Sequence, residues 1–418
     1  MEAHQQLTIG LFGFGVVGEG LYKVLQQTPS LKASIKKVCI KNIDKKRNAP
    51  ATLFTQDKNV LLNDPEINVI VEVIDDSKAA YEIVSTALKN GKMVVSASKK
   101  MIAENLQALL DLQQQTGLSL LYESAACASI PVIRNLEEYY DNDLLHAIKA
   151  IVNGSTNFIL TKMFEEHLSF SAALLLAQQM GFAESNPSLD VEGYDAVNKW
   201  SILLNHAYGI IALPQQILFT GIQHVNANDA AVAKEKGYTI KLIAQAKKLK
   251  NGKVAALVIP QFIKENEPLG FVKNEYNGVV IESGFADQQF FYGKGAGSFP
   301  TASALISDIS ALRYNYKYEY KKLYHHTPHE LTYDYYLKVY ISFTDWKNVP
   351  KNDFEWIEEW HSKEGQNYLV GAIHCQKLVN ADWWKKNNTS LVLAEDAIIE
   401  DMDIILLKKQ SLKLAGIE

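Results

Sequence analysis

Apolar runs and amphipathic segments alternate over the first third of the chain. The runs at 7–12 and 69–74 are mostly apolar, which is typical of strands buried on both faces of a parallel sheet. Apolar residues at helical spacing follow over 78–90 and 102–116, and each segment stops at a glycine. This rhythm predicts an α/β domain with a doubly wound parallel (Rossmann-type) sheet over 1–135. The remaining strands are expected at 38–40, 93–96 and 119–122.

Beyond Pro131 the alternation fades, and the pattern becomes that of an antiparallel or mixed sheet. A helix is predicted over 174–180, and another over about 300–325 returns the chain to the first domain. We therefore predict an α+β domain for substrate binding and dimerisation over 136–310. Its strands are expected at 143–152, 254–259, 278–283 and 288–292.

The last part of the chain reads as a small C-terminal α+β domain over 330–418. Residues 335–343 alternate between apolar and polar positions like a strand, and 368–373 predict another strand. A helix is expected between them, over 353–361.

Composition narrows the class of partner. The chain has 418 residues, 47% of them hydrophobic and 21% charged, which is enough for two or three globular domains. The net charge of -5 gives no reason to expect a nucleic acid or an anionic membrane as partner. The three cysteines are far apart and make neither a metal spacing nor a disulfide framework, which suits the cytoplasm. No segment approaches ~18 uninterrupted apolar residues, so no membrane span is expected.

A glycine cluster, GFGVVGEG (13–20), follows the first predicted strand. Its glycines fit G-x-G-x-x-G: the first permits a tight turn, the second lets a pyrophosphate approach the backbone, and the third lets helix and strand pack closely. A glycine-rich turn without a ligand is the alternative, which the regular strand–helix rhythm disfavours. We predict that a dinucleotide contacts Gly13, Gly15, Val16, Val17 and Gly18.

The segment after the second strand, KNIDKKR (41–47), bears on the choice of dinucleotide. An acid at this place binds the ribose 2′-hydroxyl of NAD, whereas basic residues accept the 2′-phosphate of NADP. Asn42 stands where the acid is expected, and basic residues that include Lys41 surround it. We predict NADP, with NAD also possible; a solvated basic loop is the alternative.

Two polar segments carry the candidate chemistry. Asp195 and Lys199 lie four residues apart on a predicted helix and therefore share a face, with the acid nearer the N-terminus. A lysine beside a carboxylate can hold or donate a proton, but for an arbitrary helix an ordinary surface ion pair is the favoured interpretation. His206, seven residues beyond Lys199, is interpreted as packed or hydrogen-bonded inside the helix bundle, and a second functional group on roughly the same face is the alternative. The polar cluster within 153–157 either binds a small polar substrate or caps a helix, and residue types alone leave both open.

Together these segments resemble homoserine dehydrogenase over about 7–320. The motifs that carry the resemblance are GFGVVGEG (13–20), GKMVVSASKK (91–100), YESAACASIP (122–131), NGSTNFIL (153–160), GFAESNPSLDVEGYDAVNK (181–199) and GKGAGSFPTASA (293–304). The resemblance implies reversible NAD(P)H-dependent reduction of L-aspartate 4-semialdehyde to L-homoserine, in threonine, methionine and isoleucine biosynthesis. It also implies a homodimer or homotetramer that acts on a small-molecule substrate.

The resemblance also implies roles for individual residues. The residues matching the catalytic set are Lys199, its partner Asp195, and Lys99. Those matching the substrate site are Glu184, Asp190, Gly154 and Thr156. The predicted cofactor contacts also include Lys41 from the basic segment, Ser98 beside Lys99, and Gly297 in the glycine-rich loop at 293–304. A monovalent cation, usually sodium, is implied at Glu123 and the carbonyls of Ala126 and Ala128.

Some positions depart from the family pattern. Asp75 and Asp76 replace two glycines, Ser98 replaces an asparagine, and Ala128 and Ser129 replace a glycine pair. These changes affect the cofactor preference and the cation site more than the reaction. The tail has the approximate size and the expected strand–helix–strand start of a regulatory ACT domain, but lacks the usual glycine, so a domain that only supports the dimer is an equal alternative.

Two other functions stay open on the sequence. One is another NAD(P)-dependent oxidoreductase of small amino acids with the same architecture. The other is a non-catalytic, nucleotide-binding regulatory protein, which the altered positions allow and the retained lysines oppose.

Overall fold

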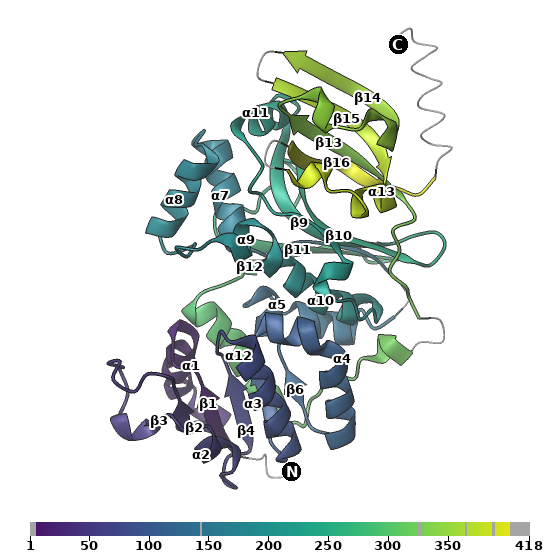
Figure 1. Cartoon of the computed structure of the whole chain (residues 1–418). Coiled ribbons are helices and arrows are strands. Elements are labelled where there is room, and N and C mark those ends of the chain that lie inside the picture. The colour runs from purple at the N-terminus through teal and green to yellow at the C-terminus, as the bar shows by residue number, and fades with distance from the viewer. Residues whose placement is uncertain (1–5, 143, 325–327, 364–365, 387–388, 402–418) are drawn as a thin grey trace. The chain divides into compact units, whose positions relative to one another are not determined.

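A computed structural model describes residues 6–142, 144–324, 328–363, 366–386 and 389–401 (Figure 1). The chain divides into two compact units. The first unit comprises Met1–Asp143, Asn198–Pro214 and Gly293–Pro328. The second comprises Leu144–Val197, Gln215–Tyr292 and His329–Glu418.

The first unit contains a six-stranded sheet in the order β3-β2-β1-β4-β5-β6, with every neighbouring pair parallel. The strands are β1 (Leu7–Phe12), β2 (Ala33–Cys39), β3 (Phe54–Thr55), β4 (Val69–Glu72), β5 (Met93–Ser96) and β6 (Leu120–Leu121). The helices include α1 (Val16–Gln27), α2 (Asn59–Leu62), α3 (Ser77–Lys89), α4 (Lys99–Thr116), α5 (Ser124–Cys127), α6 (Val132–Arg134) and α12 (Ser298–Leu312). The predicted doubly wound parallel sheet is therefore confirmed.

Local sequence explains where these helices begin and end. The Asp76 carboxylate accepts a hydrogen bond from the backbone N–H of Ala79 at 3.1 Å and so caps the start of α3. Gly91 and Gly117 follow α3 and α4 with φ of 79° and 68°, a left-handed conformation that glycine adopts without a Cβ clash. Helix α12, from the later part of the chain, packs against α1 as the predicted return helix would, but it ends at Leu312 instead of continuing to about residue 325.

The second unit is built on a ten-stranded sheet in the described part of the chain, in the order β12-β11-β7-β9-β10-β16-β13-β15-β14, with β8 beside β10. Its strands before the tail are β7 (Leu145–Ile151), β8 (Leu218–Phe219), β9 (Tyr238–Lys248), β10 (Val254–Lys264), β11 (Tyr276–Ser283) and β12 (Asp287–Lys294). Its helices include α7 (Gly154–Glu165), α8 (Phe170–Gln179), α9 (Ser188–Val191) and α11 (Ala227–Glu235), and α10 (Tyr194–Tyr208) carries the chain into the first unit. The predicted mixed sheet is confirmed.

The tail adds four antiparallel strands and a short helix. They are β13 (Tyr336–Phe343), β14 (Phe354–Lys363), β15 (Gln366–His374), α13 (Cys375–Val379) and β16 (Thr389–Ile399). The helix predicted over 353–361 is wrong, because these residues form β14, in which buried Phe354 and Trp356 alternate with less buried neighbours. The strand–helix–strand start expected of an ACT domain is therefore absent from the described residues between β13 and β14, which contain only short 3-10 turns.

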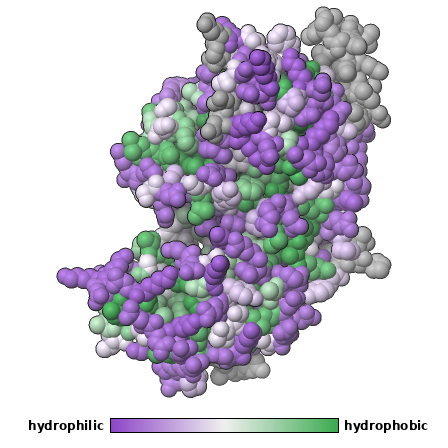
Figure 2. Space-filling model, in the orientation of Figure 1, coloured by the Kyte–Doolittle hydropathy of each residue, from purple (hydrophilic) through white to green (hydrophobic). Residues whose placement is uncertain are grey.

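The tail strands and the preceding strands share one hydrophobic core. A single apolar cluster includes Leu257 and Ile259 of β10 together with Val339 and Leu393 of the tail. Tail and sheet are also joined by a fully buried carboxylate, Asp229 of α11, whose Oδ1 accepts a hydrogen bond from the hydroxyl of Tyr340 at 3.1 Å. The surface in Figure 2 is mostly polar, with apolar patches set among polar ones. No helix in the described ranges is long and apolar enough to cross a bilayer.

Candidate active site

The turn between β1 and α1 needs glycine at two places. Gly13 has φ of 98°, and a Cβ there would lie 2.8 Å from the carbonyl oxygen of Val73. A Cβ on Gly18 would lie 2.3 Å from the carbonyl oxygen of Gly13. By contrast, no atom lies within 4 Å of a Cβ built on Gly15, so the backbone there faces open space. A tight turn that leaves one backbone edge open at the start of a helix is suited to a pyrophosphate.

A fourth glycine of this cluster has a role that the motif did not predict. A Cβ on Gly20 would lie 2.4 Å from Ser298 Oγ, so only glycine lets α12 start so close to α1. The Ser298 hydroxyl donates to the carbonyl oxygen of Val16, at 2.8 Å. Gly297, the N-cap residue of α12, has φ of 118°. The predicted cofactor residues of the two loops therefore lie in one unit, and the extra glycine in GFGVVGEG was the available signal.

A buried acid at the end of β4 connects two loops at the carboxyl edge of the sheet. Glu72 Oε1 accepts a hydrogen bond from the backbone N–H of Ile74 at 2.7 Å, and Oε2 accepts one from the Ser96 hydroxyl at 2.6 Å. Ser96 Oγ in turn accepts the backbone N–H of Ser98 at 3.1 Å, directly before Lys99, the first residue of α4. Ligands of doubly wound sheets bind at this edge. Glu72 was not predicted, although it is the one charged residue in an apolar strand.

The basic segment after β2 is exposed at Lys41, Lys45 and Lys46 and half-buried at Arg47. The side chain of Lys41 is 82% exposed, and its Nζ lies 3.6 Å from the Asp76 carboxylate. Asn42 Oδ1 accepts the backbone N–H of Asp44 at 2.9 Å, which stabilises the turn. Asp76, one of the departures from the family pattern, is thus both the cap of α3 and a neighbour of Lys41.

At the predicted cation site, one buried carboxylate accepts hydrogen bonds from two backbone N–H groups. Glu123 is 2% exposed, and its two oxygens accept the N–H groups of Ile133 and Arg134 at 2.8 and 2.9 Å. Arg134 also forms an ion pair with fully buried Asp308 at 2.9 Å. Ala128 has φ of 44° and ψ of −105°, a conformation that favours glycine. No group of three or more potential metal ligands from His, Cys, Asp and Glu occurs among the described residues, so a cation there would rely on backbone carbonyls.

Three buried carboxyls make the stability of the first unit depend on pH. Burial raises the pKa of Glu72 from 4.5 to about 7, of Asp308 from 3.8 to about 6, and of Glu123, with a further rise from nearby Asp308, from 4.5 to about 8. Each of these pKa values is higher in the folded chain than in the unfolded one. The contribution of the three carboxyls to the free energy of unfolding is therefore fully present below about pH 4, and it is lost as the pH rises through the folded pKa values.

We therefore expect the melting temperature of the wild-type protein to fall between pH 5 and pH 8. The melting temperature of the Glu72→Gln variant should fall less over the same range. The rise at Glu72 corresponds to roughly 3 kcal/mol. Thermal unfolding at several pH values measures this, with Glu66→Gln as control because Glu66 is exposed. A Glu72→Gln profile that parallels the wild-type profile would contradict the prediction.

Asn153 connects two acids of the predicted substrate and catalytic sets. Its Nδ2 donates to Asp190 Oδ1 at 2.7 Å and to Asp195 Oδ2 at 2.8 Å. Its Oδ1 accepts the backbone N–H of Thr156 at 2.8 Å and caps α7. The helix-cap interpretation of the polar cluster is therefore confirmed at Asn153, whose amide also holds both acids. Substrate binding by the cluster stays a prediction. The sequence places Asn153 in this polar cluster but did not predict its contacts with Asp190 and Asp195.

The other residues at the start of α7 contact neighbouring segments of the second unit. A Cβ on Gly154 would lie 2.5 Å from the carbonyl oxygen of Glu275, so this close approach requires glycine. Thr156 is 1% exposed and its hydroxyl donates to the carbonyl oxygen of Asn153 at 3.1 Å. Asn157 accepts a hydrogen bond from Lys241, a buried lysine whose pKa burial lowers to about 7.

Asp195 and Lys199 both lie on α10, one turn apart, and each is only 7% exposed. Charged side chains are seldom so buried unless they have partners. The interpretation as an ordinary surface ion pair is therefore excluded. Glu184, in contrast, is exposed in the loop before α9, and its side chain makes no hydrogen bond or ion pair to another described residue. The structure brings Asn153, Asp190 and Asp195 together but adds no contact from Glu184.

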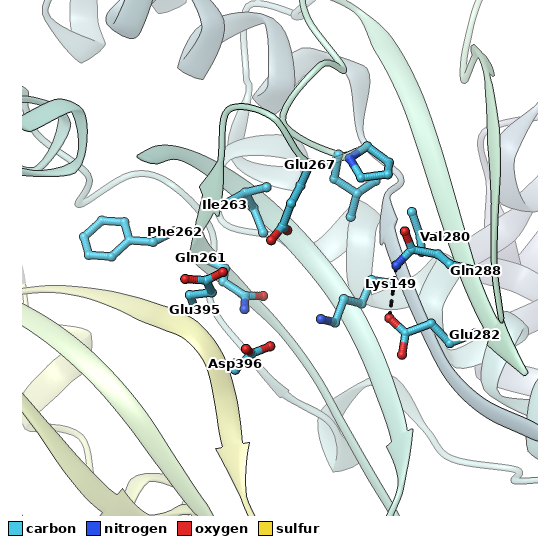
Figure 3. A pocket seen from close by; sticks show the side chains of 12 residues that line it. Lys149, Gln261, Phe262, Ile263, Glu267, Val280, Glu282, Gln288, Glu395 and Asp396 are labelled. Carbon is cyan, nitrogen blue, oxygen red and sulfur yellow. Dashed lines mark hydrogen bonds between the residues drawn. The ribbon is translucent and has the colours of Figure 1, made fainter. Parts of the chain in front are cut away.

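The second unit also contains a cavity of ≈ 290 Å³, which lies apart from the predicted site residues (Figure 3). It is lined by Lys149 of β7, Gln261 of β10 and Glu395 of β16, among others, and contains none of the predicted site residues. We therefore do not assign the active site to it.

Comparisons with known proteins agree on one family. The model for homoserine dehydrogenase matches residues 131–310, and that for its NAD-binding domain matches residues 13–123. Homoserine dehydrogenase of Bacillus subtilis is 34% identical over 318 residues, which cover 74% of this chain and 73% of that protein. The enzyme of Synechocystis is 36% identical, covering 72% of each chain.

Solved structures agree with these relatives. A homoserine dehydrogenase from Thiobacillus denitrificans superposes with a TM-score of 0.81 at 26% identity, covering 93% of this chain and 98% of that one. A hyperthermophilic archaeal homoserine dehydrogenase in complex with NADPH superposes with a TM-score of 0.63 at 26% identity, covering 75% and 99%.

Proposed function

Because the chain belongs to the homoserine dehydrogenase family, we propose that Lys199 handles the proton of the family's reaction and that Asp195 holds Lys199 in place. The reaction is the reversible reduction of L-aspartate 4-semialdehyde to L-homoserine with a nicotinamide nucleotide, a step of amino-acid biosynthesis. The alternatives of another oxidoreductase and of an idle regulatory protein find no support among the relatives.

The observation that carries the proposal is the buried polar group around Asn153. A buried carboxylate such as Asp195 needs hydrogen bonds or a cation, and the Asn153 amide supplies one to Asp195 and one to half-buried Asp190. Asp195 is therefore held at a fixed place one helical turn before Lys199. Asp190 is held with it, as an anion suited to the ammonium of an amino-acid substrate.

Each residue then has a definite task. The bound nicotinamide supplies the hydride. The Lys199 ammonium donates a proton to the developing alkoxide and stabilises its charge, and in the oxidation direction the neutral amine accepts that proton. Lys99 acts as a second cation toward the reacting oxygen. Asp190 and Glu184 bind the substrate ammonium, with Gly154 and Thr156 beside it.

The decisive measurement is NADPH consumption with L-aspartate 4-semialdehyde by a variant without the Lys199 ammonium. Loss of kcat with retained NADPH binding supports the assignment, and an unchanged kcat overturns it.

We further propose that the cofactor is NADP rather than NAD. The 2′-phosphate would be bound by Lys41 and by Lys45 and Lys46, which are exposed after β2. The N-terminus of α1 and the open backbone at Gly15 would receive the pyrophosphate, with Val16 and Val17 next to it in sequence. Gly297, which precedes the Ser298 that contacts α1, and Ser98, which precedes α4, are the further proposed cofactor contacts.

For the double variant Lys41→Ala/Lys45→Ala we expect the KM for NADPH to rise about tenfold or more, and that for NADH to stay within about twofold. Steady-state kinetics with both nucleotides measure the ratio. Lys89→Ala is the matched control, because this exposed lysine lies in the last turn of α3, at the opposite edge of the sheet from the cofactor loops. Equal changes for NADPH and NADH would contradict the preference.

Two further features remain proposals. A monovalent cation, sodium in our proposal, would be held mainly by the carbonyls of Ala126 and Ala128, because the Glu123 carboxylate already accepts two backbone hydrogen bonds. Assembly as a homodimer or homotetramer would use the second unit. The cytoplasmic location and the division into domains at residues 135, 310 and 330 stay predictions.

A further inference from the structure

The C-terminal part of α10 carries a histidine in a buried polar network. His206 is 1% exposed, and its Nδ1 lies 2.6 Å from Oε1 of Glu137. Its Nε2 lies 3.0 Å from the hydroxyl of Tyr122, which is in turn 3.0 Å from the hydroxyl of Tyr320. Both ring nitrogens therefore have partners from segments distant in sequence.

The partners of His206 are themselves fixed by other contacts. The second oxygen of Glu137 accepts the backbone N–H of Tyr320 at 3.1 Å, and the Tyr320 hydroxyl accepts a hydrogen bond from Gln113 at 3.0 Å. Buried Lys322 donates to the carbonyl oxygen of His206 at 2.7 Å, near the end of α10. The network therefore holds both the side chain and the backbone of the helix.

The charge state of Glu137 agrees with this geometry. Burial raises the pKa of its carboxyl, but the charge and hydrogen bond of His206 and the N–H of Tyr320 outweigh burial, so the pKa is lowered overall. Glu137 is an anion near neutral pH. With Nδ1–H of His206 donating to it, Nε2 is the atom that faces Tyr122.

The position of His206 and Glu137 relative to Lys199 indicates a role for the network. His206 follows Lys199 by seven residues, about 10 Å along the helix and nearly on the same face. Glu137 and His206 are joined by a buried hydrogen bond of 2.6 Å between side chains 69 residues apart in sequence. Directional hydrogen bonds fix how far a helix is rotated and shifted along its axis.

We propose that His206 and Glu137 are a positioning pair that sets the rotation and axial position of α10, and through them the place of the Lys199 ammonium. The proposal rests on the role proposed above for Lys199. The residues of the pair do not touch the substrate; they act through the helix.

The test compares Glu137→Gln, His206→Gln and the double variant, using kcat, KM for the semialdehyde, the NADPH dissociation constant by fluorescence, and thermal unfolding. We expect each single change to lower kcat about tenfold or more, with KM and NADPH affinity within about twofold. Because the two residues act as a unit, the double variant should be no slower than the slower single variant. Glu137→Gln is nearly isosteric, which keeps the test usable if His206→Gln folds poorly.

Ser201→Ala is the matched control for general loosening of the same helix. The buried Ser201 hydroxyl donates to the carbonyl oxygen of Ala212, so the variant loses a hydrogen bond of α10 without touching the pair. A near-wild-type kcat in Ser201→Ala supports the proposal. It is overturned by wild-type kcat in both pair variants, or by an equal fall in Ser201→Ala at an equal loss of stability. Lys199→Ala separates the two ideas: if it is inactive while the pair variants are not, only the positioning role fails.

Discussion

Lys199→Ala is expected to lower kcat for NADPH-dependent reduction of L-aspartate 4-semialdehyde about 10²–10⁴-fold, the usual size of a general-acid contribution. The alkoxide formed by hydride transfer needs a proton and a nearby positive charge, and Lys199 would supply both. Binding of NADPH should stay within about twofold, because the cofactor residues lie on other elements. Oxidation of homoserine should fall by a similar factor, since the same group acts there as base.

The matched control is Lys23→Ala. Glu19 and Lys23 form an ion pair of the same spacing and order on α1, with Nζ and Oε1 2.7 Å apart, but their side chains are 35% and 44% exposed. Such a surface pair contributes only a few tenths of a kcal/mol, so its loss should leave kcat unchanged. Lys199→Ala with wild-type kcat, or Lys23→Ala with an equal loss, would remove the proton role from Lys199.

The parts of the fold that were predicted are those whose signal is local. Strands such as β4 are continuous apolar runs, and helices such as α3 end at a glycine that must adopt positive φ. The helix predicted over 353–361 was wrong because the local pattern there does not decide between helix and strand. Residues Phe354 to Trp360 also place apolar residues at a spacing compatible with a helix, and only pairing with β15 selects the strand.

In the candidate site, too, the features that are local in sequence could be predicted and those that depend on packing could not. The Asp195–Lys199 spacing is a local feature and could be predicted, but its burial could not, and burial is what excludes a surface pair. The contacts of Asn153 span 37 and 42 residues, and the contact of His206 with Glu137 spans 69. Such contacts depend on how distant segments pack, and no periodicity along the chain encodes them. Glu72 and Ser96 come from neighbouring strands for the same reason.

Asn153→Ala is expected to lower kcat/KM about 10²–10⁴-fold, because it removes two hydrogen bonds to carboxylates, each worth about 1.5–3 kcal/mol when an ion is involved. It also removes the cap of α7, at a cost of about 1 kcal/mol in stability. Ser169→Ala removes a cap of the same kind from α8, where the Ser169 hydroxyl accepts the N–H of Ala172 at 3.3 Å. Ser169→Ala should therefore lose stability and keep its kcat/KM.

Asn153→Asp separates the cap from the contacts with the acids. A carboxylate keeps an acceptor for the N–H of Thr156 and suits a helix N-terminus, yet it places a third negative charge against Asp190 and Asp195. If holding the two acids is what matters, kcat/KM should fall further in Asn153→Asp than in Asn153→Ala. If the cap alone matters, Asn153→Asp should retain most activity, and Ser169→Ala and Asn153→Ala should show similar kcat/KM at similar stability loss. Steady-state kinetics and thermal unfolding of the three variants therefore decide whether Asn153 serves the reaction or only the helix.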